Sequence, residues 1–237
     1  MIKVLILALY FFLIQSLHAQ IINDSLLPPN PVTYIKNIYN SKLNNELPIF
    51  NGKQHYAYSS LIEGYAYYPD NEWKTGTVVY DGIAYNNILL KYDIVKDEVV
   101  ITSPEGSIYI ALFSPRIQEF TFSEFKFINI EKGNEFLLPQ GFYRVLLKGQ
   151  ATVLSKITKS IKEEIVNNEL NRRFEQETKY YIVKEGKCRY IRNKEALLNS
   201  LQEKRKAVQD YISHNKLKYR KQIEETIVAA TRFYNNH

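Results

Sequence analysis

Cysteine is almost absent from this sequence of 237 residues, since Cys188 is the only one. A single cysteine excludes an intramolecular disulfide, whereas exported eukaryotic domains of this size usually carry several. Cys188 lies in the segment KEGKCRYIR, beside an expected turn and with no histidine near it in the sequence. A thiolate nucleophile needs a base or a cation beside it. We therefore interpret Cys188 as a half-buried strand residue, with a reactive thiol as the alternative.

The residue patterns of the common catalytic and metal sites are also missing. The chain has few glycines, which fall at expected turns, and it contains neither a phosphate-binding loop nor a G-x-S-x-G sequence. The later histidines, His55, His214 and His237, show neither H-E-x-x-H spacing nor paired cysteines beside them. The sequence therefore predicts no catalytic residue of a familiar type, no metal site and no cofactor.

Long apolar runs are absent after the first residues, so no helix of the roughly 20 residues that span a bilayer is expected there. At the start of the chain, Lys3 precedes an apolar run at 4–14, and Ala19 offers a small residue for cleavage. This order is typical of a secretory signal peptide. We predict a signal peptide at 1–19 and an exported protein that is periplasmic, outer-membrane-associated or secreted. The lack of disulfides favours a bacterial envelope.

Short apolar runs between turn residues dominate the middle of the chain. In the segment 78–101, the pairs Asp81-Gly82, Asn86-Asn87 and Lys96-Asp97 separate such runs, and side chains at 88–94 alternate with the period of a strand. Asp-Gly is a strong signal for a two-residue hairpin turn. The pattern predicts a mainly β (α+β) fold: an antiparallel β-meander forming a sandwich, open barrel or half-barrel at 50–192, after an N-terminal extension at 20–49.

Tyrosine is unusually frequent at the start of this region. An aromatic ring with a polar tip suits a half-buried sheet face, so cross-strand packing explains many of the tyrosines. The segment GYAYYPDNEW at 64–73 has the composition of a loop, and it gathers four rings. An aromatic platform could hold sugar rings or an extended peptide. The candidate binding residues are Tyr65, Tyr67, Tyr68 and Trp73.

Charge divides the chain into two halves. Residues 20–150 carry 11 Lys and Arg against 14 Asp and Glu, whereas residues 151–237 carry 19 against 11. Solvated helices of mixed charge explain the basic half, and docking on an anionic surface is the alternative. No nucleic-acid-binding module is recognised. The charged segment near 157–178 has poor periodicity and is predicted to be a linker or a frayed helix.

The C-terminal segment at 193–237 is predicted to be basic and helical. Before it, residues 179–192 are expected to form a hairpin that turns at Glu185-Gly186. Asn193 has the properties of a helix N-cap, with Glu195 in the first turn. A last helix is predicted from one apolar stripe, which should dock within the chain. Its residues are Tyr219, Ile223, Ile227, Ala230 and Tyr234.

Three segments carry a resemblance to known proteins: FNGKQHY, TGTVVYDGIAYNNILLKYDIVKDEVVI and KLKYRKQIEETIVAATRFY. In these segments the sequence resembles a family of exported proteins from Bacteroidetes-type bacteria, and the resemblance covers most of the chain after the signal peptide. It implies a signal peptide, a tyrosine-rich β-meander and a lysine-rich helical end. The family has no assigned activity, so the resemblance implies no functional residue.

Three functions fit these patterns. The first is a non-enzymatic cell-envelope protein that binds an envelope protein or glycan through its tyrosine-rich β surface. The second is a carboxylate-dependent hydrolase acting on envelope glycan or peptide, with Asp93 as the first candidate. Such an enzyme needs two acids about 5–9.5 Å apart, which spacing in the sequence cannot establish. The third is a scaffold whose basic C-terminal helices dock on an anionic surface.

Overall fold

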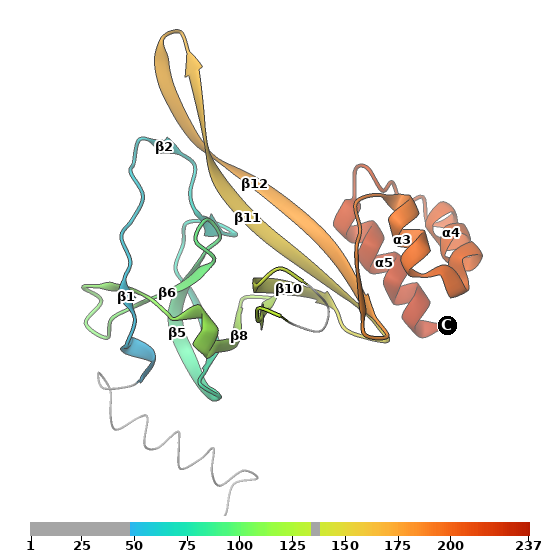
Figure 1. Ribbon diagram of the computed structural model, residues 1–237, viewed down its shortest axis with the longest axis horizontal. Coiled ribbons are helices and arrows are strands. Elements are labelled where there is room, and N and C mark those ends of the chain that lie inside the picture. Colours follow the sequence, from blue (N-terminus) through green and yellow to red (C-terminus); the bar gives the residue numbers. More distant parts are fainter. Residues whose placement is uncertain (1–47, 134–137) are drawn as a thin grey trace, which may run out of the picture. The chain divides into compact units, whose positions relative to one another are not determined.

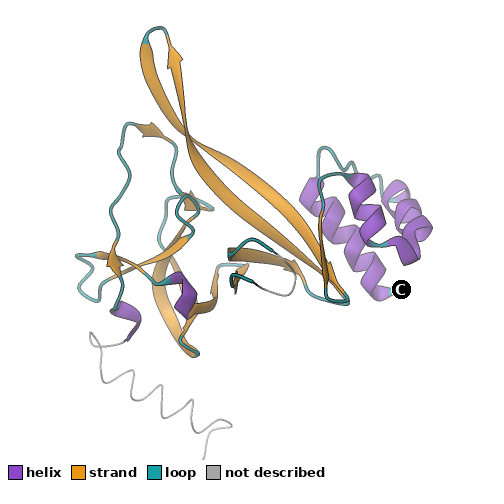
Figure 2. Ribbon diagram, in the orientation of Figure 1, coloured by secondary structure: helices purple, strands orange, loops and turns teal. Residues whose placement is uncertain are grey.

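The computed structural model describes residues 48–133 and 138–237. The predicted signal peptide and residues 20–47 of the predicted extension lie outside these residues. The described chain is mainly β with C-terminal helices, as the sequence predicts (Figure 2). The strands are β1 (Lys53–Gln54), β2 (Ile62–Glu63), β3 (Tyr67–Tyr68), β4 (Lys74–Tyr80), β5 (Ile83–Asp93), β6 (Glu98–Thr102), β7 (Tyr109–Ala111), β8 (Ile117–Phe122), β9 (Phe125–Ile130), β10 (Gly141–Leu147), β11 (Ala151–Val166), β12 (Glu169–Lys184) and β13 (Lys187–Tyr190). The helices are α3 (Lys194–Ser200), α4 (Arg205–His214) and α5 (Ile223–Asn236), with 3₁₀ turns at Pro48–Phe50, Ser114–Arg116 and Gln202–Lys204.

The described strands form one open sheet (Figure 1). Its main path runs β1-β7-β6-β5-β4-β8-β9-β10-β11-β12-β13, while β2 pairs with β12 and β3 pairs with β5. Every pairing is antiparallel except that of β2 with β12. Most strands lie beside a neighbour in sequence, which is the meander that the regular turns predict.

Residues with positive φ set the turns of the meander. Asp81 and Gly82 have φ of 51° and 74° and join β4 to β5, so the predicted hairpin is confirmed. Asp97, with φ of 58°, ends the turn between β5 and β6. The prediction of a turn at Asn86-Asn87 is wrong, because both residues lie inside β5. Asn87 has φ of 57° where the register with β4 shifts, so the pair forms a β-bulge.

The prediction of a charged linker near 157–178 is wrong. These residues form the outer part of the hairpin β11–β12, which turns at Asn167-Asn168 with φ of 54° and 65°. Side chains of opposite charge pair across the strands: Arg172 lies directly opposite Glu163 at 2.7 Å, and Arg173 reaches the diagonal Glu164 at 2.9 Å. Cross-strand ion pairs stabilise a ribbon by a few tenths of a kcal/mol up to about 1 kcal/mol each. The outer parts of these strands carry charged residues in place of alternating apolar residues, so the sequence lacked the pattern by which strands are recognised.

The three helices of the described residues pack against the sheet and one another, which confirms the predicted docking of the last helix within the chain. The side chain of Asn193 accepts a hydrogen bond from the backbone N–H of Ala196 at 2.8 Å, which confirms the predicted N-cap of α3. The last helix is shorter than predicted, because α5 begins at Ile223 and Tyr219 lies in the preceding turn. Ile223 is 39% exposed, so only the later residues of the stripe, from Ile227 on, are buried.

Two main apolar cores support the sheet. The first core lies among β4 to β10 and includes Tyr92, Phe120 and Phe127, whose rings stack or meet edge to face. The second core lies between the helices and strands β10 to β13. Cys188 lies half-buried in β13, as predicted, and burial raises the pKa of its thiol to about 11. A thiol with so high a pKa is protonated at neutral pH and is a poor nucleophile. No helix in the described residues has the length and apolar character of a membrane-spanning segment.

Candidate functional site

Three aromatic rings and one lysine gather on one face of the sheet near β3, β5 and β7. We call Tyr67, Trp73, Lys91 and Tyr109 the aromatic–lysine cluster. The ring centroids of Trp73 and Tyr109 are 5.1 Å apart and the rings are tilted by 53°. Tyr109 is 41% exposed, while Tyr67, Trp73 and Lys91 are half-buried. The cluster is therefore open to solvent but supported from below.

Lys91 connects the rings of the cluster. Its ammonium lies 4.6 Å from the ring centroid of Tyr67 and 5.0 Å from that of Trp73. It also donates a hydrogen bond to the side-chain oxygen of Asn71 at 3.1 Å. Burial lowers the pKa of Lys91, opposed in part by Glu72 and Asp70. Among the residues that the structure describes, no carboxylate forms an ion pair with this ammonium, and its direct contacts are the two rings and the amide oxygen of Asn71.

A group of polar side chains, formed by His55, Asp93 and Tyr58, lies beneath the cluster and contacts Tyr67. The hydroxyl of Tyr67 lies 3.0 Å from Nε2 of His55. This imidazole nitrogen lies 3.9 Å from the carboxylate of Asp93, and the hydroxyl of Tyr58 donates to the same carboxylate at 3.0 Å. Asp93 is fully buried and His55 is 5% exposed. Buried polar groups that bond one another fix side-chain positions, so the ring of Tyr67 is held in one orientation.

The environment of His55, Tyr58 and Tyr67 keeps these three side chains uncharged. Burial is the main cause that lowers the pKa of His55, and Lys96 lowers it further. Burial together with the charge of Asp93 raises the pKa of Tyr67 to about 12 and raises that of Tyr58 even more. His55 and the two tyrosines are therefore neutral at neutral pH. Nδ1 of His55 is buried and has no hydrogen-bond partner within the described chain.

The structure divides the four predicted binding residues. Tyr67 and Trp73 lie together in the aromatic–lysine cluster. Tyr65 is 37% exposed and packs under a different lysine, with Nζ of Lys159 4.0 Å from its ring centroid. Tyr68 pairs with Tyr92 in the register of β3 and β5 and packs on the first core. Adjacent strand residues point to opposite faces, so the four side chains do not form one surface.

Tyr68 has a structural role in this arrangement. Its ring meets Phe125 and Phe127 edge to face, with centroids 5.2 Å and 5.9 Å apart. Its hydroxyl accepts a hydrogen bond from Arg144 at 3.1 Å.

The residues of the cluster that the sequence did not identify are Lys91 and Tyr109. Alternation along β5 places Lys91 on the same face as Asp93, but nothing in the sequence brings β7 beside Trp73.

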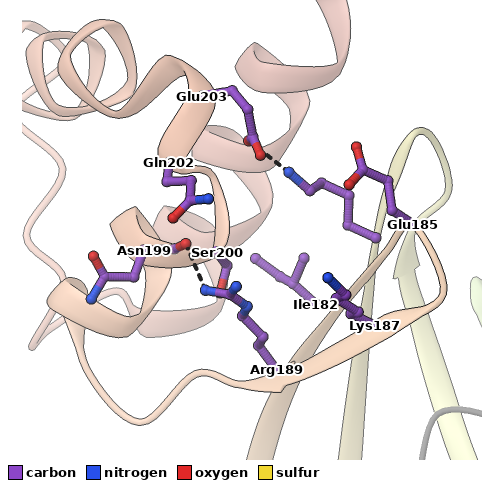
Figure 3. Close-up of a pocket in the computed structure, with 9 residues that line it drawn as sticks. Ile182, Glu185, Lys187, Arg189, Asn199, Ser200, Gln202 and Glu203 are labelled. Carbon is purple, nitrogen blue, oxygen red and sulfur yellow. Dashed lines mark hydrogen bonds and ion pairs between the residues drawn. The ribbon is translucent and has the colours of Figure 1, made fainter.

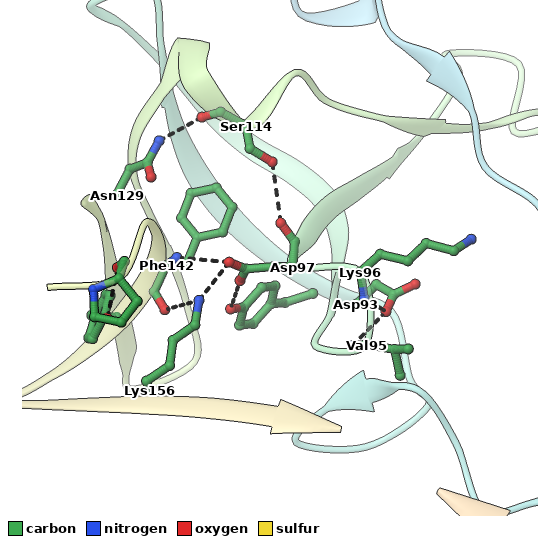
Figure 4. Close-up of polar contacts among 11 residues, drawn as sticks. Asp93, Val95, Lys96, Asp97, Ser114, Asn129, Phe142 and Lys156 are labelled. Carbon is green, nitrogen blue, oxygen red and sulfur yellow. Dashed lines mark hydrogen bonds and ion pairs between the residues drawn. The ribbon is translucent and has the colours of Figure 1, made fainter. Parts of the chain in front are cut away.

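A second, half-buried polar group ties the turn between β5 and β6 to β10 and β11 (Figure 4). The ammonium of Lys156 lies 2.6 Å from the carboxylate of Asp97, which also accepts a hydrogen bond from the hydroxyl of Tyr92. Lys156 donates in addition to the backbone oxygen of Phe142 at 3.1 Å. Asp97 therefore does more than end its turn, because its carboxylate also contacts β11 and the first core. This ion pair holds two parts of the sheet together.

Asp93 stabilises the same turn from the other face. Besides Tyr58, it accepts hydrogen bonds from the backbone N–H groups of Val95 and Lys96 at 2.9 Å and 3.0 Å (Figure 4). The residue opposite Asp93 is Glu98 in β6, whose carboxylate lies 3.6 Å from Nζ of Lys53. In the described residues, no group of three or more His, Cys, Asp or Glu side chains has the arrangement of a metal site. Asp93 thus has the partners of a carboxylate that fixes a turn.

A small polar cavity lies where the hairpin β12–β13 meets α3 (Figure 3). Its volume is about 70 Å³, which holds a few water molecules but is far below the roughly 300 Å³ of typical ligand pockets. Two of its cations are already bound: Lys184 to Glu203 at 2.6 Å and Arg189 to the backbone oxygen of Asn199 at 2.9 Å. The cavity is part of the packing between hairpin and helix.

Comparisons with protein-family models, with curated proteins and with solved structures found no match to this chain.

Proposed function

We propose that this chain is an exported, non-enzymatic cell-envelope protein that binds an envelope glycan or an extended peptide through the aromatic–lysine cluster. The observation that carries the proposal is the position of Lys91 between the rings of Tyr67 and Trp73, without a carboxylate partner among the described residues. Rings offer flat apolar faces to a sugar or to a peptide side chain, and the ammonium offers a hydrogen-bond donor. The composition of residues 1–19 supports export.

Rigidity supports the same proposal. The ring of Tyr67 is fixed by His55, and Lys91 is fixed by Asn71. A surface whose side chains are held before binding loses less conformational entropy when a ligand arrives. The remaining tyrosines of the region serve the fold, as Tyr68 and Tyr92 do in the first core.

The test compares alanine variants of the cluster with a matched tyrosine outside it. Trp73→Ala and Tyr109→Ala should each weaken binding to soluble peptidoglycan fragments or to extended peptides about tenfold or more, the loss typical of an aromatic contact residue. Tyr56→Ala is the control, since Tyr56 is 68% exposed and lies outside the cluster. Isothermal titration calorimetry measures the affinities. Equal losses in all three variants, or no change in any, would remove the cluster as a binding site.

A carboxylate-dependent hydrolase is the second candidate, because Asp93 and Glu98 face each other across β5 and β6. It predicts hydrolysis of peptidoglycan fragments by the wild-type chain and its loss in Asp93→Asn and in Glu98→Gln. We favour the binding function, since Tyr58 and two backbone N–H groups occupy the carboxylate of Asp93. Released reducing ends or peptides above the level of the two variants would favour the enzyme instead.

A further inference from the structure

Four cations lie close together in the sequence between α4 and α5. We call residues 216–221 the basic loop. Its cationic side chains are all exposed, and no ion pair joins them to another described residue. They are Lys216, Lys218, Arg220 and Lys221. Four of the nine Lys and Arg residues at 193–237 therefore lie in one loop rather than on a helix face.

The basic loop is held in a fixed conformation. Leu217 and Tyr219 alternate with the cations and pack against the second core. The hydroxyl of Tyr219 donates to the backbone oxygen of Ile191 at 3.4 Å, and the backbone N–H of Leu217 donates to Ile212 at 3.1 Å. The N–H of Lys221 donates to the backbone oxygen of Lys218 at 2.9 Å. Because the apolar residues anchor the loop inward, the cations are presented to solvent together.

The neighbouring acids do not neutralise the loop. Glu224, in the first turn of α5, lies 3.1 Å from Arg144 and accepts a hydrogen bond from Tyr180 at 3.3 Å. Glu225 accepts a hydrogen bond from the side-chain amide of Gln222 at 2.9 Å. Among the described residues, only Glu225 next to the loop has no cationic partner. A net positive surface remains, and it attracts anions over roughly the Debye length of 8 Å at physiological salt.

An apolar side chain lies at the edge of this charged surface. Ile223, the first residue of α5, is 39% exposed and follows the basic loop by two positions. Cations beside an exposed aliphatic side chain match the interface of a bilayer, where headgroup phosphates meet hydrocarbon. We propose that the basic loop and Ile223 dock the protein on a bilayer that contains anionic phospholipid. This surface is separate from the aromatic–lysine cluster and does not depend on its function.

The test measures cosedimentation of the full chain with vesicles. Vesicles of phosphatidylcholine with about a third phosphatidylglycerol should bind the wild-type chain at low salt, and binding should fall steeply at high salt. Vesicles of phosphatidylcholine alone are the control for binding that does not depend on charge. This control includes binding through the apolar run at 4–14. The combined variant K216Q/K218Q/R220Q/K221Q should bind at least a hundredfold more weakly, since each cation near an anionic bilayer contributes about fivefold.

The matched control removes four exposed cations elsewhere, in the variant K132Q/K148Q/K187Q/K206Q. It should retain binding to within a few fold, and both variants should melt within a few degrees of the wild type. Three results would overturn the proposal: no difference between anionic and neutral vesicles for the wild type, an equal loss in both variants, or binding to the soluble polyanion heparin without binding to anionic vesicles. Replacement of Ile223 by serine should weaken vesicle binding but leave heparin binding unchanged.

Discussion

At the scale of single residues, the molecule depends on polar groups that are buried or half-buried within a tyrosine-rich sheet. His55 and Asp93 lie behind the aromatic–lysine cluster, and Asp97 and Lys156 join the turn after β5 to β10 and β11. Buried polar groups destabilise a fold when a partner is lost and fix geometry when all partners are present. Alternation in the sequence placed Asp93 and Lys91 on one face, but it gave no sign that His55 would lie beside them.

His55 gives the fold a predictable dependence on pH. Burial lowers the pKa of His55 in the folded state, so the unfolded chain binds a proton more readily below about pH 6.5. The stability that neutral His55 provides is therefore present above this pH and is lost as the pH falls towards the lower folded pKa. The free energy of unfolding, measured by urea denaturation from pH 7.5 to 5, should decline more steeply for the wild type than for His55→Gln. An equal or shallower decline in the wild type would contradict this assignment.

Gly141 is the residue that admits the ion pair between Asp97 and Lys156. Its φ is +128°, and a Cβ atom there would overlap both the carboxylate of Asp97 and the ammonium of Lys156. Gly141→Ala should lower the free energy of unfolding by about 2–4 kcal/mol, from backbone strain and loss of the pair. Gly106→Ala is the control, because φ there is +71° and no atom lies within 4 Å of the added Cβ. Its cost should be about 1 kcal/mol, as measured by thermal or urea denaturation.

At the scale of elements, the turns were predictable and the long hairpin was not. Local conformational preferences set the turns at Asp81-Gly82 and Glu185-Gly186 and the helix N-cap at Asn193. These roles could therefore be predicted from the sequence. The hairpin β11–β12 has few apolar residues in its outer part, and its pairing depends on contacts between residues far apart in the sequence. The bulge at Asn87 was missed for a different reason. A bulge and a turn both use asparagine at positive φ, so the local sequence does not distinguish them.

The outer part of this hairpin provides a test of charge patterning. Arg172→Glu should place an acid directly opposite Glu163 and reduce the protection of nearby amides from hydrogen exchange. The double variant that exchanges the two residues, Arg172→Glu with Glu163→Arg, should restore most of the protection. Both side chains are about half exposed, so the coupling should be only about 0.3–1 kcal/mol. Equal protection in the single and double variants would show that the pair does not stabilise the ribbon.

At the scale of the whole molecule, the composition predicted the fold class, and the candidate surface needed the tertiary structure. The few glycines at turns and the alternating apolar residues indicated an antiparallel meander, and the described residues confirm it. Two of the four predicted binding residues, Tyr67 and Trp73, lie together. Tyr109 joins them from β7 because β7 pairs with β6 and β6 with β5. No local pattern in the sequence contains that pairing.

The central claim is that a ligand binds at the aromatic–lysine cluster, and one property of the chain makes it directly measurable. Trp73 is the only tryptophan, so intrinsic tryptophan fluorescence reports on the cluster alone. Titration with soluble peptidoglycan fragments, and separately with extended peptides, should shift the emission of Trp73 to shorter wavelength and protect it from quenching by acrylamide. The shift should saturate and be lost in Lys91→Met. Saturable binding of these ligands, seen by calorimetry, without any change in the emission of Trp73 would contradict the account.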